Sequence, residues 1–228
     1  MSLHPERAID PASEAALEHV DDDATLGLGT GRAAEAFVHA LGIAVAQGLS
    51  VRGVPTSERT AALARELDIP LVSLAEAGRI DVTFDGADEF DPKLDVIKGY
   101  GGALVREKIV AASSEKLVIL VGPEKRVDVL GSRGKLPVEV LPFGETLCRH
   151  ELRALGCEPE TRRADDGAPY LTDNGNYILD CKIAPIGSPR EFETAILAIP
   201  GVLGTGLFLD MANYVIVRDG DQAEVLAR

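Results

Sequence analysis

The chain has 228 residues, of which 46% are hydrophobic, and its formal net charge at pH 7 is −14. This length and apolar fraction suffice for one α/β domain, or for a large domain with a small companion. The strong negative charge argues against nucleic acid and against an anionic membrane surface as partners.

Short apolar strands alternate with helical patterns through the first half of the chain. A helix is predicted to begin at Asp10 and Pro11 and to run to about Val20, because Asp is a favoured N-cap and Pro a favoured first residue. The other helices are predicted over residues 33–46, 57–67 and 103–110, and the strands over residues 25–28, 49–54, 71–74, 82–84 and 116–121. This alternation is typical of a mostly parallel sheet that is covered on both faces.

From residue 137 the order of the predicted elements changes. A strand over residues 137–141 precedes a helix over residues 144–155, and two more strands follow with turns at 165–167 and 173–176. A helix over 191–199 and a strand over 202–208 complete a β-α-β-β-α-β order, which predicts a small ferredoxin-like α+β domain. Residues 214–217 are expected to return to the first sheet as a strand.

The cysteine and histidine residues give no sign of a metal site. Cys148, Cys157 and Cys181 are far apart and form no CxxC pair, and the four histidines show no ligand spacing. No metal and no cofactor are therefore expected. The first residues contain no apolar signal core, and no apolar run approaches membrane-spanning length, so the expected location is the cytoplasm with no membrane partner.

The most informative segment runs from Asp85 to Lys108. Acids follow the predicted strand 82–84 in the string DGADE, and the glycine-rich string KGYGG opens the helix that carries Glu107. Open α/β sheets bind ligands at the carboxyl ends of their strands, and glycines at a helix N-terminus allow an anion to approach. A lysine and a separate glutamate add a fixed cation and a possible base. This set suits proton abstraction next to a carbonyl group.

A simpler alternative is that these charges form a solvated surface loop, as most charged clusters do. A calcium-binding loop is excluded by the spacing. The third and sixth positions from Asp85 are Ala87 and Phe90, where such a loop needs an oxygen ligand and a glycine.

A second glycine-rich string, GLGTG at residues 27–31, follows the first predicted strand. Gly29, Gly31 and Ala34 fit the G-x-G-x-x-A pattern of dinucleotide-binding proteins. Such proteins need an acid at the end of the second strand, and residues 53–55 (GVP) contain none, which disfavours NAD. A phosphate-binding loop is the favoured interpretation, with a purely structural turn as the alternative.

Residues 85–110, DGADEFDPKLDVIKGYGGALVREKIV, resemble the signature region of ribose-5-phosphate isomerase, type A. Similar motifs follow the order of that family along nearly the whole chain: GLGTG at 27–31, GVPTS at 53–57, KRVDVLG at 125–131, PVEV at 137–140, IPGV at 199–202 and TGLF at 205–208. The resemblance implies a cofactor-free interconversion of ribose 5-phosphate and ribulose 5-phosphate through an enediolate.

The resemblance also implies roles for individual residues. Glu107 is the expected base, and Lys98 is the cation that stabilises the enediolate, helped by the N–H groups of residues 99–102. Asp85 is expected to assist opening of the furanose ring, and Asp88 to orient Lys98 and the sugar hydroxyls. The predicted substrate-binding residues are Thr30, Gly31, Arg32, Ala33, Asp85, Gly86, Ala87, Asp88, Lys98, Gly99, Tyr100, Gly101 and Lys125, with the phosphate end assigned to Thr30, Gly31, Arg32 and Lys125.

Two places depart from the pattern of the family. Arg32 and Ala33 stand where these isomerases usually have serine and threonine, so a guanidinium replaces two hydroxyl donors next to the phosphate. Residues 122–124 (GPE) also differ from the usual Ala-Asp-x-Ser before Lys125, which itself matches but is equally typical of a surface lysine. An isomerase of another phosphosugar therefore stays open as an alternative.

The resemblance divides the chain into a Rossmann-like catalytic domain, residues 1–132 plus 207–228, and the ferredoxin-like domain, residues 133–206. It further implies a homodimer or homotetramer, with the apolar small domain as a contact surface. A non-catalytic sugar-phosphate-sensing domain, as in some transcription regulators, is the main alternative from another class. It is disfavoured because the short stretch before the first predicted strand leaves no room for a helix-turn-helix.

Overall fold

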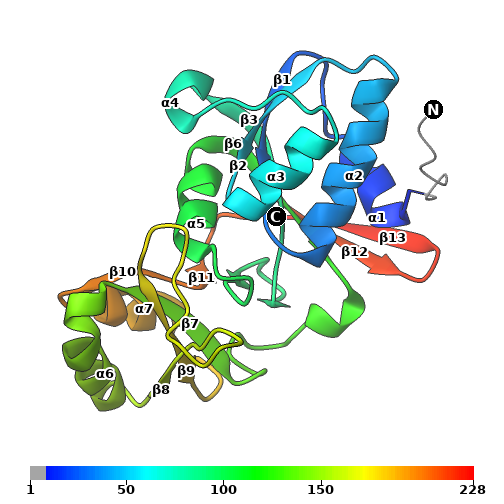
Figure 1. Cartoon of the computed structure of the whole chain (residues 1–228). Helices are drawn as coiled ribbons and strands as arrows, with labels where there is room; N and C mark the ends of the chain where they lie inside the picture. Colours follow the sequence, from blue (N-terminus) through cyan, green and yellow to red (C-terminus); the bar gives the residue numbers. More distant parts are fainter. Residues whose placement is uncertain (1–8) are drawn as a thin grey trace.

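The computed structural model describes residues 9–228, and its centre is a six-stranded sheet in the order β13-β12-β6-β3-β1-β2 (Figure 1). Residues 1–8 lie outside the described residues. They include the start of the predicted first domain and the N-terminal residues that show no apolar signal core. The pairings β2–β1, β1–β3, β3–β6 and β6–β12 are parallel, and only β13 is antiparallel to its neighbour. The predicted mostly parallel sheet is confirmed. Its strands are β1 (Ala24–Leu28), β2 (Val51–Pro55), β3 (Ile80–Gly86), β6 (Ser114–Val121), β12 (Tyr214–Asp219) and β13 (Gln222–Ala227).

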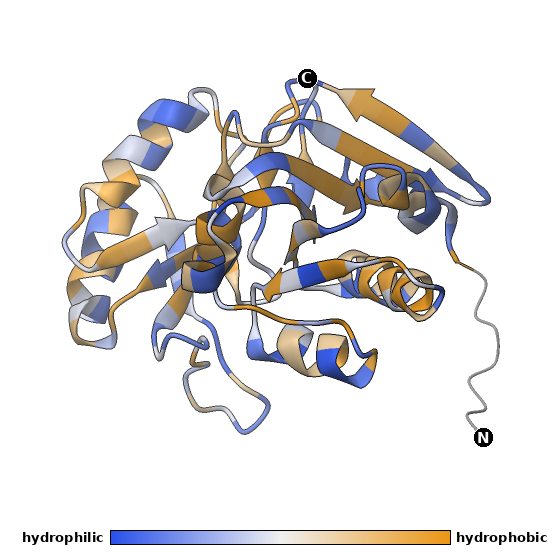
Figure 2. Ribbon diagram, turned by 90° about the horizontal axis from the view of Figure 1, so that it is seen from above, coloured by the Kyte–Doolittle hydropathy of each residue, from blue (hydrophilic) through white to orange (hydrophobic). Residues whose placement is uncertain are grey.

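Helices cover both faces of this large sheet. In β6, Val118 and Leu120 pack with the helices of one face, and Leu117 and Ile119 pack in the core of the other face. The first face carries α1 (Pro11–Leu17), α2 (Arg32–Ala46) and α3 (Glu58–Glu66), and the second carries α4 (Leu74–Ala77) and α5 (Leu104–Ala112). Figure 2 shows the strands of the large sheet mainly as hydrophobic and the helices as mixed. This is the pattern of a buried sheet under amphipathic helices.

A second sheet is antiparallel and has the strand order β10-β7-β9-β8. The chain runs β7-α6-β8-β9-α7-β10, which confirms the predicted β-α-β-β-α-β order and, with this strand order, a ferredoxin-like arrangement. The elements are β7 (Lys135–Val140), α6 (Glu145–Ala154), β8 (Glu158–Thr161), β9 (Tyr177–Lys182), α7 (Pro189–Leu197) and β10 (Val202–Thr205). They lie at the lower left of Figure 1.

A three-stranded ribbon, β11-β5-β4, joins the two sheets. It consists of β4 (Glu89–Phe90), β5 (Val96–Ile97) and β11 (Leu207–Phe208). Ile97 and Leu207 pack in the core of the small sheet, whereas Phe90 and Phe208 pack against the large sheet. Since Leu207 belongs to the predicted first domain but packs with the second, the division at residues 133 and 207 stays a prediction.

Several segments differ from the predicted elements. Residues 71–74 form no strand, because Leu71 makes only an isolated bridge to Gly53 and Ser73 starts α4 through a capping box with Glu76. The predicted strand 202–208 is split at Gly206, where the chain leaves β7 and joins β5. Helix α1 ends at Leu17, three residues before the predicted end. Within residues 9–228, no helix combines the length and apolar character needed to cross a membrane.

Candidate active site

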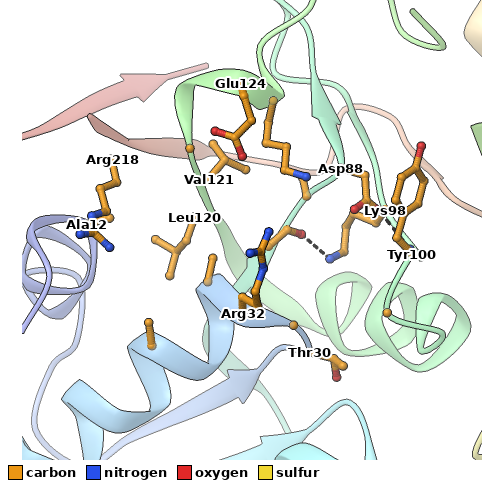
Figure 3. Close-up of a pocket in the computed structure, with 18 of the residues that line it drawn as sticks. Ala12, Thr30, Arg32, Asp88, Lys98, Tyr100, Leu120, Val121, Glu124 and Arg218 are labelled. Atoms are coloured by element: carbon orange, nitrogen blue, oxygen red, sulfur yellow. Dashed lines mark hydrogen bonds between the residues drawn. The ribbon is translucent and has the colours of Figure 1, made fainter. Parts of the chain in front are cut away.

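A cavity of about 520 Å³ lies where β1, β3, β6 and β12 end (Figure 3). Carboxyl ends of parallel strands are where open α/β sheets bind ligands, and the volume suits a small molecule. Every predicted site residue except Asp85 lines this cavity: Thr30, Gly31, Arg32, Ala33, Gly86, Ala87, Asp88, Lys98, Gly99, Tyr100, Gly101, Glu107 and Lys125. The structure thus brings together residues from three separate parts of the sequence.

Lys98 and Glu107 form the buried centre of the site. Lys98 follows β5, where its backbone N–H donates to the Gly206 carbonyl, and Glu107 lies in the first turn of α5. The Lys98 Nζ atom lies 3.3 Å from Oε2 of Glu107 and 2.9 Å from Oδ2 of Asp85, and it donates to the Gly86 carbonyl. Oε2 of Glu107 accepts no hydrogen bond within the described residues. It therefore has a lone pair available for a proton.

Burial raises the pKa of Glu107 to about 8, and the negative charge of Asp85 adds to the increase while Lys98 opposes it. Burial alone lowers the pKa of Lys98, but the charges of Asp85 and Glu107 outweigh it, so that this pKa is raised. Lys98 is therefore a permanent cation near neutral pH. Glu107 binds and releases a proton close to neutral pH, as a general base should.

Asp85 has a different place from the one expected. Its side chain is 1% exposed and lies outside the cavity lining, where it pairs with Lys98 and accepts from the N–H groups of Thr30 and Gly86. Asp88, in contrast, lines the cavity, and its Oδ2 accepts from the Tyr100 N–H at 3.0 Å. Asp85 is therefore the acid that pairs with Lys98 in this structure, whereas Asp88 binds the glycine-rich turn. The roles expected for the two acids in ring opening and in orienting the sugar stay predictions.

The loop between β1 and α2 is shaped for an anion. Gly31 has a φ of +114°, which only glycine adopts without strain, and it turns the chain so that α2 begins at Arg32. The first N–H groups of α2 have no acceptor within their own helix, and Gly31, Arg32 and Ala33 at this end of the helix line the cavity. The Thr30 hydroxyl lies 2.8 Å from the hydroxyls of Thr56 and Ser57, so it braces the loop from behind.

The bracing hydroxyls were missed as functional residues by the sequence reasoning. Ser57 caps α3 and also bonds Thr30, and Thr60 bonds both Thr30 and the Gly29 carbonyl. The resemblance of GVPTS to a second family loop was the signal that pointed to this segment. In this structure these hydroxyls bond one another and the loop between β1 and α2.

Three cations other than Lys98 line the cavity. Arg32 is exposed, forms no ion pair within the described residues, and projects its guanidinium into the cavity from the start of α2 (Figure 3). Lys125 follows β6 in the short helix η1 (Pro123–Lys125). Arg218 in β12 was not predicted, because no local motif marks a strand residue so far along the chain. In the described part of the chain, no group of three or more His, Cys, Asp or Glu residues is placed to hold a metal ion.

The family model of ribose 5-phosphate isomerase A (phosphoriboisomerase A) matches residues 52–222. The chain belongs to this family. Proteins named ribose-5-phosphate isomerase A from Gloeobacter violaceus and Roseiflexus sp. (strain RS-1) are 52% and 50% identical to it over 216 and 212 residues. The alignments cover 94% of this chain and 94% of the former, and 92% of this chain and 91% of the latter.

The family is also recognisable in three dimensions. A solved structure of a D-ribose-5-phosphate isomerase in complex with phospho-erythronic acid superimposes with a TM-score of 0.92 at 39% identity. The match covers 95% of this chain and 96% of that one. The ribose-5-phosphate isomerase A of Methanocaldococcus jannaschii gives a TM-score of 0.91 at 37% identity with the same coverage. Both sheets therefore belong to the fold of the family.

Proposed function

We propose that the protein interconverts D-ribose 5-phosphate and D-ribulose 5-phosphate by proton transfer, as an aldose-ketose isomerase of the pentose phosphate pathway. The observation that carries this proposal is the buried pair of Lys98 and Glu107, 3.3 Å apart, in the cavity of a chain that belongs to this isomerase family. A base next to a fixed cation is what enediolate chemistry requires.

In the forward direction, the Glu107 carboxylate removes the proton from C2 of the open-chain aldose. The electrons of that C–H bond form the C1=C2 double bond, and the C1 carbonyl oxygen becomes an oxyanion opposite the Lys98 ammonium. A proton then moves from the oxygen on C2 to the oxygen on C1. Glu107 returns its proton to C1, which leaves a C2 carbonyl and a regenerated carboxylate. No oxidant, reductant or cofactor takes part.

We assign the phosphate end to the loop between β1 and α2. The substrate carries negative charge, and the chain has a net charge of −14, so that attraction must come from local donors. The first turn of α2 offers N–H groups, and Arg32 and Lys125 offer positive charge in the same cavity. Holding the phosphate fixes the reacting carbons near Glu107 and lowers the entropic part of the barrier.

We further propose a homodimer or homotetramer in the cytoplasm that binds no nucleic acid, with the two domains divided at residues 133 and 207. Phe143, in the short helix after β7, is fully exposed, and Leu141, Leu147 and Leu203 of the same predicted small domain are partly exposed. An exposed apolar group of this kind favours a protein contact. Light scattering should give a mass of two or four chains, and Phe143→Ser should shift it toward one chain. A monomeric wild type contradicts this part of the proposal.

The activity itself is tested by incubating the protein with ribose 5-phosphate in excess EDTA, without nucleotide, and following ribulose 5-phosphate. Turnover is expected, whereas a sensing domain would bind the sugar without converting it, and a metal-dependent enzyme would be inhibited. In deuterated water, recovered sugar should carry deuterium at C1 or C2. Turnover with no deuterium in the sugar would indicate a hydride shift and contradict the proton-transfer scheme.

A further inference from the structure

The turn that follows Lys98, residues 99–102, contacts side chains from β7 and from the connection between β8 and β9. Tyr170 packs so closely on Gly102 that a Cβ there has no room, and Gly102 has a φ of +89°. Lys135 lies 4.1 Å from the ring centre of Tyr100, and the Tyr100 hydroxyl donates to the Lys135 carbonyl. The geometry of an active-site turn therefore depends on residues that do not line the cavity.

Arg162, directly after β8, makes the most direct of these contacts. Its Nη1 donates to the carbonyl oxygens of Gly99 and Tyr100, at 3.1 Å each. Its Nε and Nη2 donate to the two carboxylate oxygens of Asp180 in β9. The Arg162 side chain is only 12% exposed. The guanidinium thus binds a carboxylate on one side and two carbonyl oxygens on the other. These contacts leave it little freedom to move.

These bonds fix the orientation of two consecutive peptide groups. In a trans peptide the C=O and the following N–H point in opposite directions. With the Gly99 carbonyl on Arg162, the Tyr100 N–H points the other way, to Asp88 at 3.0 Å. With the Tyr100 carbonyl also on Arg162, the Gly101 N–H points away from Arg162, and Gly101 lines the cavity. This N–H donates no hydrogen bond to an acceptor in residues 9–228.

We propose that Arg162, aligned by Asp180, is a positioning residue of the isomerase. It holds the peptide groups after Lys98 so that the Gly101 N–H faces the sugar oxygens and Asp88 keeps its place in the cavity. Arg162 does not itself touch the substrate, since it is absent from the cavity lining. Two groups near this turn, the Lys98 ammonium and the Gly101 N–H, then stabilise the negatively charged oxygen of the enediolate.

The test compares Arg162→Ala with Arg163→Ala. Arg163 is the adjacent arginine in the same loop, but its side chain bonds only the Gly167 carbonyl, on the exposed surface. Arg162→Ala should lower kcat by roughly 10- to 100-fold, the effect of misplacing a catalytic donor by about 1 Å, and change KM much less. Arg163→Ala should keep the wild-type kcat. Guanidinium ion, at concentrations far below those that unfold proteins, should restore part of the activity of Arg162→Ala.

Two conservative variants keep the test decisive if Arg162→Ala does not fold. Arg162→Lys keeps one positive charge but cannot bind Asp180 and both carbonyls at once, and Asp180→Asn keeps the shape but loses the charge that aligns Arg162. Both should lower kcat with the wild-type KM and with an unshifted pH profile, because neither touches Glu107. A wild-type kcat in all folded variants, with a lowered melting temperature only, would overturn the proposal.

This inference rests on the isomerase activity proposed above, and the two are separated by a measurement that needs no turnover. Amide hydrogen exchange at Tyr100, whose N–H donates to Asp88, is followed by NMR and reports on the turn alone. Exchange should be faster in Arg162→Ala than in wild type and unchanged in Arg163→Ala. An inactive wild type would refute the proposed function. Equal exchange in all three proteins would refute the role of Arg162.

Discussion

The Nζ atom of Lys98 lies 3.3 Å from Oε2 of Glu107, and the two side chains are 3% and 2% exposed. The same ammonium pairs with Asp85 at 2.9 Å, so that one buried cation faces two carboxyl groups. A single positive charge cannot compensate two buried negative charges, and one carboxyl group therefore takes up a proton more readily. The raised pKa of Glu107 follows mainly from burial, and the negative charge of Asp85 adds to it.

Glu107→Gln should remove nearly all turnover and leave substrate binding largely intact. The amide keeps the shape of the side chain but cannot accept the proton from the sugar. The loss of a general base typically lowers the rate by about 10²–10⁴-fold. Steady-state kcat and the affinity for the substrate, measured by calorimetry, check this, and a kcat near the wild-type value would remove Glu107 as the base.

The same residue should make stability depend on pH. The pKa of Glu107 is about 8 in the folded chain and about 4.5 in the unfolded chain, so between these values the folded state keeps a proton that the unfolded state has released. The free energy of unfolding therefore falls as the pH rises from about 4.5 to 8. Above that range this residue adds no further change.

Thermal unfolding of Glu107→Gln at several pH values measures this contribution. Between pH 5 and 8 the free energy of unfolding should fall less for the variant than for wild type. The difference between the two proteins should therefore change in favour of the variant as the pH rises. Exchange of the exposed Glu66 for Gln serves as the matched control and should leave the profile unchanged. Parallel profiles for wild type and Glu107→Gln would contradict the raised pKa.

Lys98→Ala should lower kcat strongly, because it removes the charge that stabilises the oxyanion in the transition state. It should also destabilise the fold by about 3–5 kcal/mol, since it leaves the buried Asp85 without its cation. The exposed Lys116 of β6 provides a control, and Lys116→Ala should change neither quantity. Kinetics and urea unfolding check the prediction. A small effect on both kcat and the free energy of unfolding would indicate that Lys98 stabilises neither the transition state nor the fold.

Arg32→Ala should raise KM for ribose 5-phosphate, because a charge-assisted hydrogen bond to phosphate is worth about 1.5–3 kcal/mol, or roughly tenfold to hundredfold in KM. Binding of unphosphorylated ribose should change little. The double change Arg32→Ser and Ala33→Thr restores the usual hydroxyls of the family and should recover part of the affinity. Equal KM values for wild type and Arg32→Ala would leave the phosphate to Lys125 and the N–H groups of α2. KM values for other phosphosugars, measured alongside, show whether Arg32 has altered substrate preference.

Most of the fold could be predicted because its signals are local. The buried strand β6 appears in the sequence as an apolar run from Leu117 to Val121, and α2 begins immediately after Gly31. The short α4 was missed because residues 71–74 (LVSL) form a short apolar run typical of a strand, while the capping pair Ser73 and Glu76 overlaps the end of that run. In this case, the capping hydrogen bonds outweighed the strand pattern.

The site was predictable where its residues are close in sequence. Lys98 and Glu107 belong to one motif, and both line the cavity. Arg218 was not predictable, because only the order of the strands in the sheet brings β12 next to the cavity. That Asp85, and not Asp88, pairs with Lys98 was not predictable for a related reason. Asp85 lies at the end of β3 and Asp88 just after it, and the direction of each side chain depends on contacts that distant parts of the chain provide.

The contacts of Arg162 and Tyr170 with the turn after Lys98 have a consequence for shortened forms of the protein. A fragment that keeps the large sheet but lacks residues 133–206 would retain Lys98, Glu107 and every residue of the phosphate loop. It would nevertheless expose Ile97 and Leu207 to water and release the turn from its only arginine contact among the described residues. Such a fragment would keep the residues proposed for catalysis, and we expect it to have little activity because the turn that positions them is no longer held.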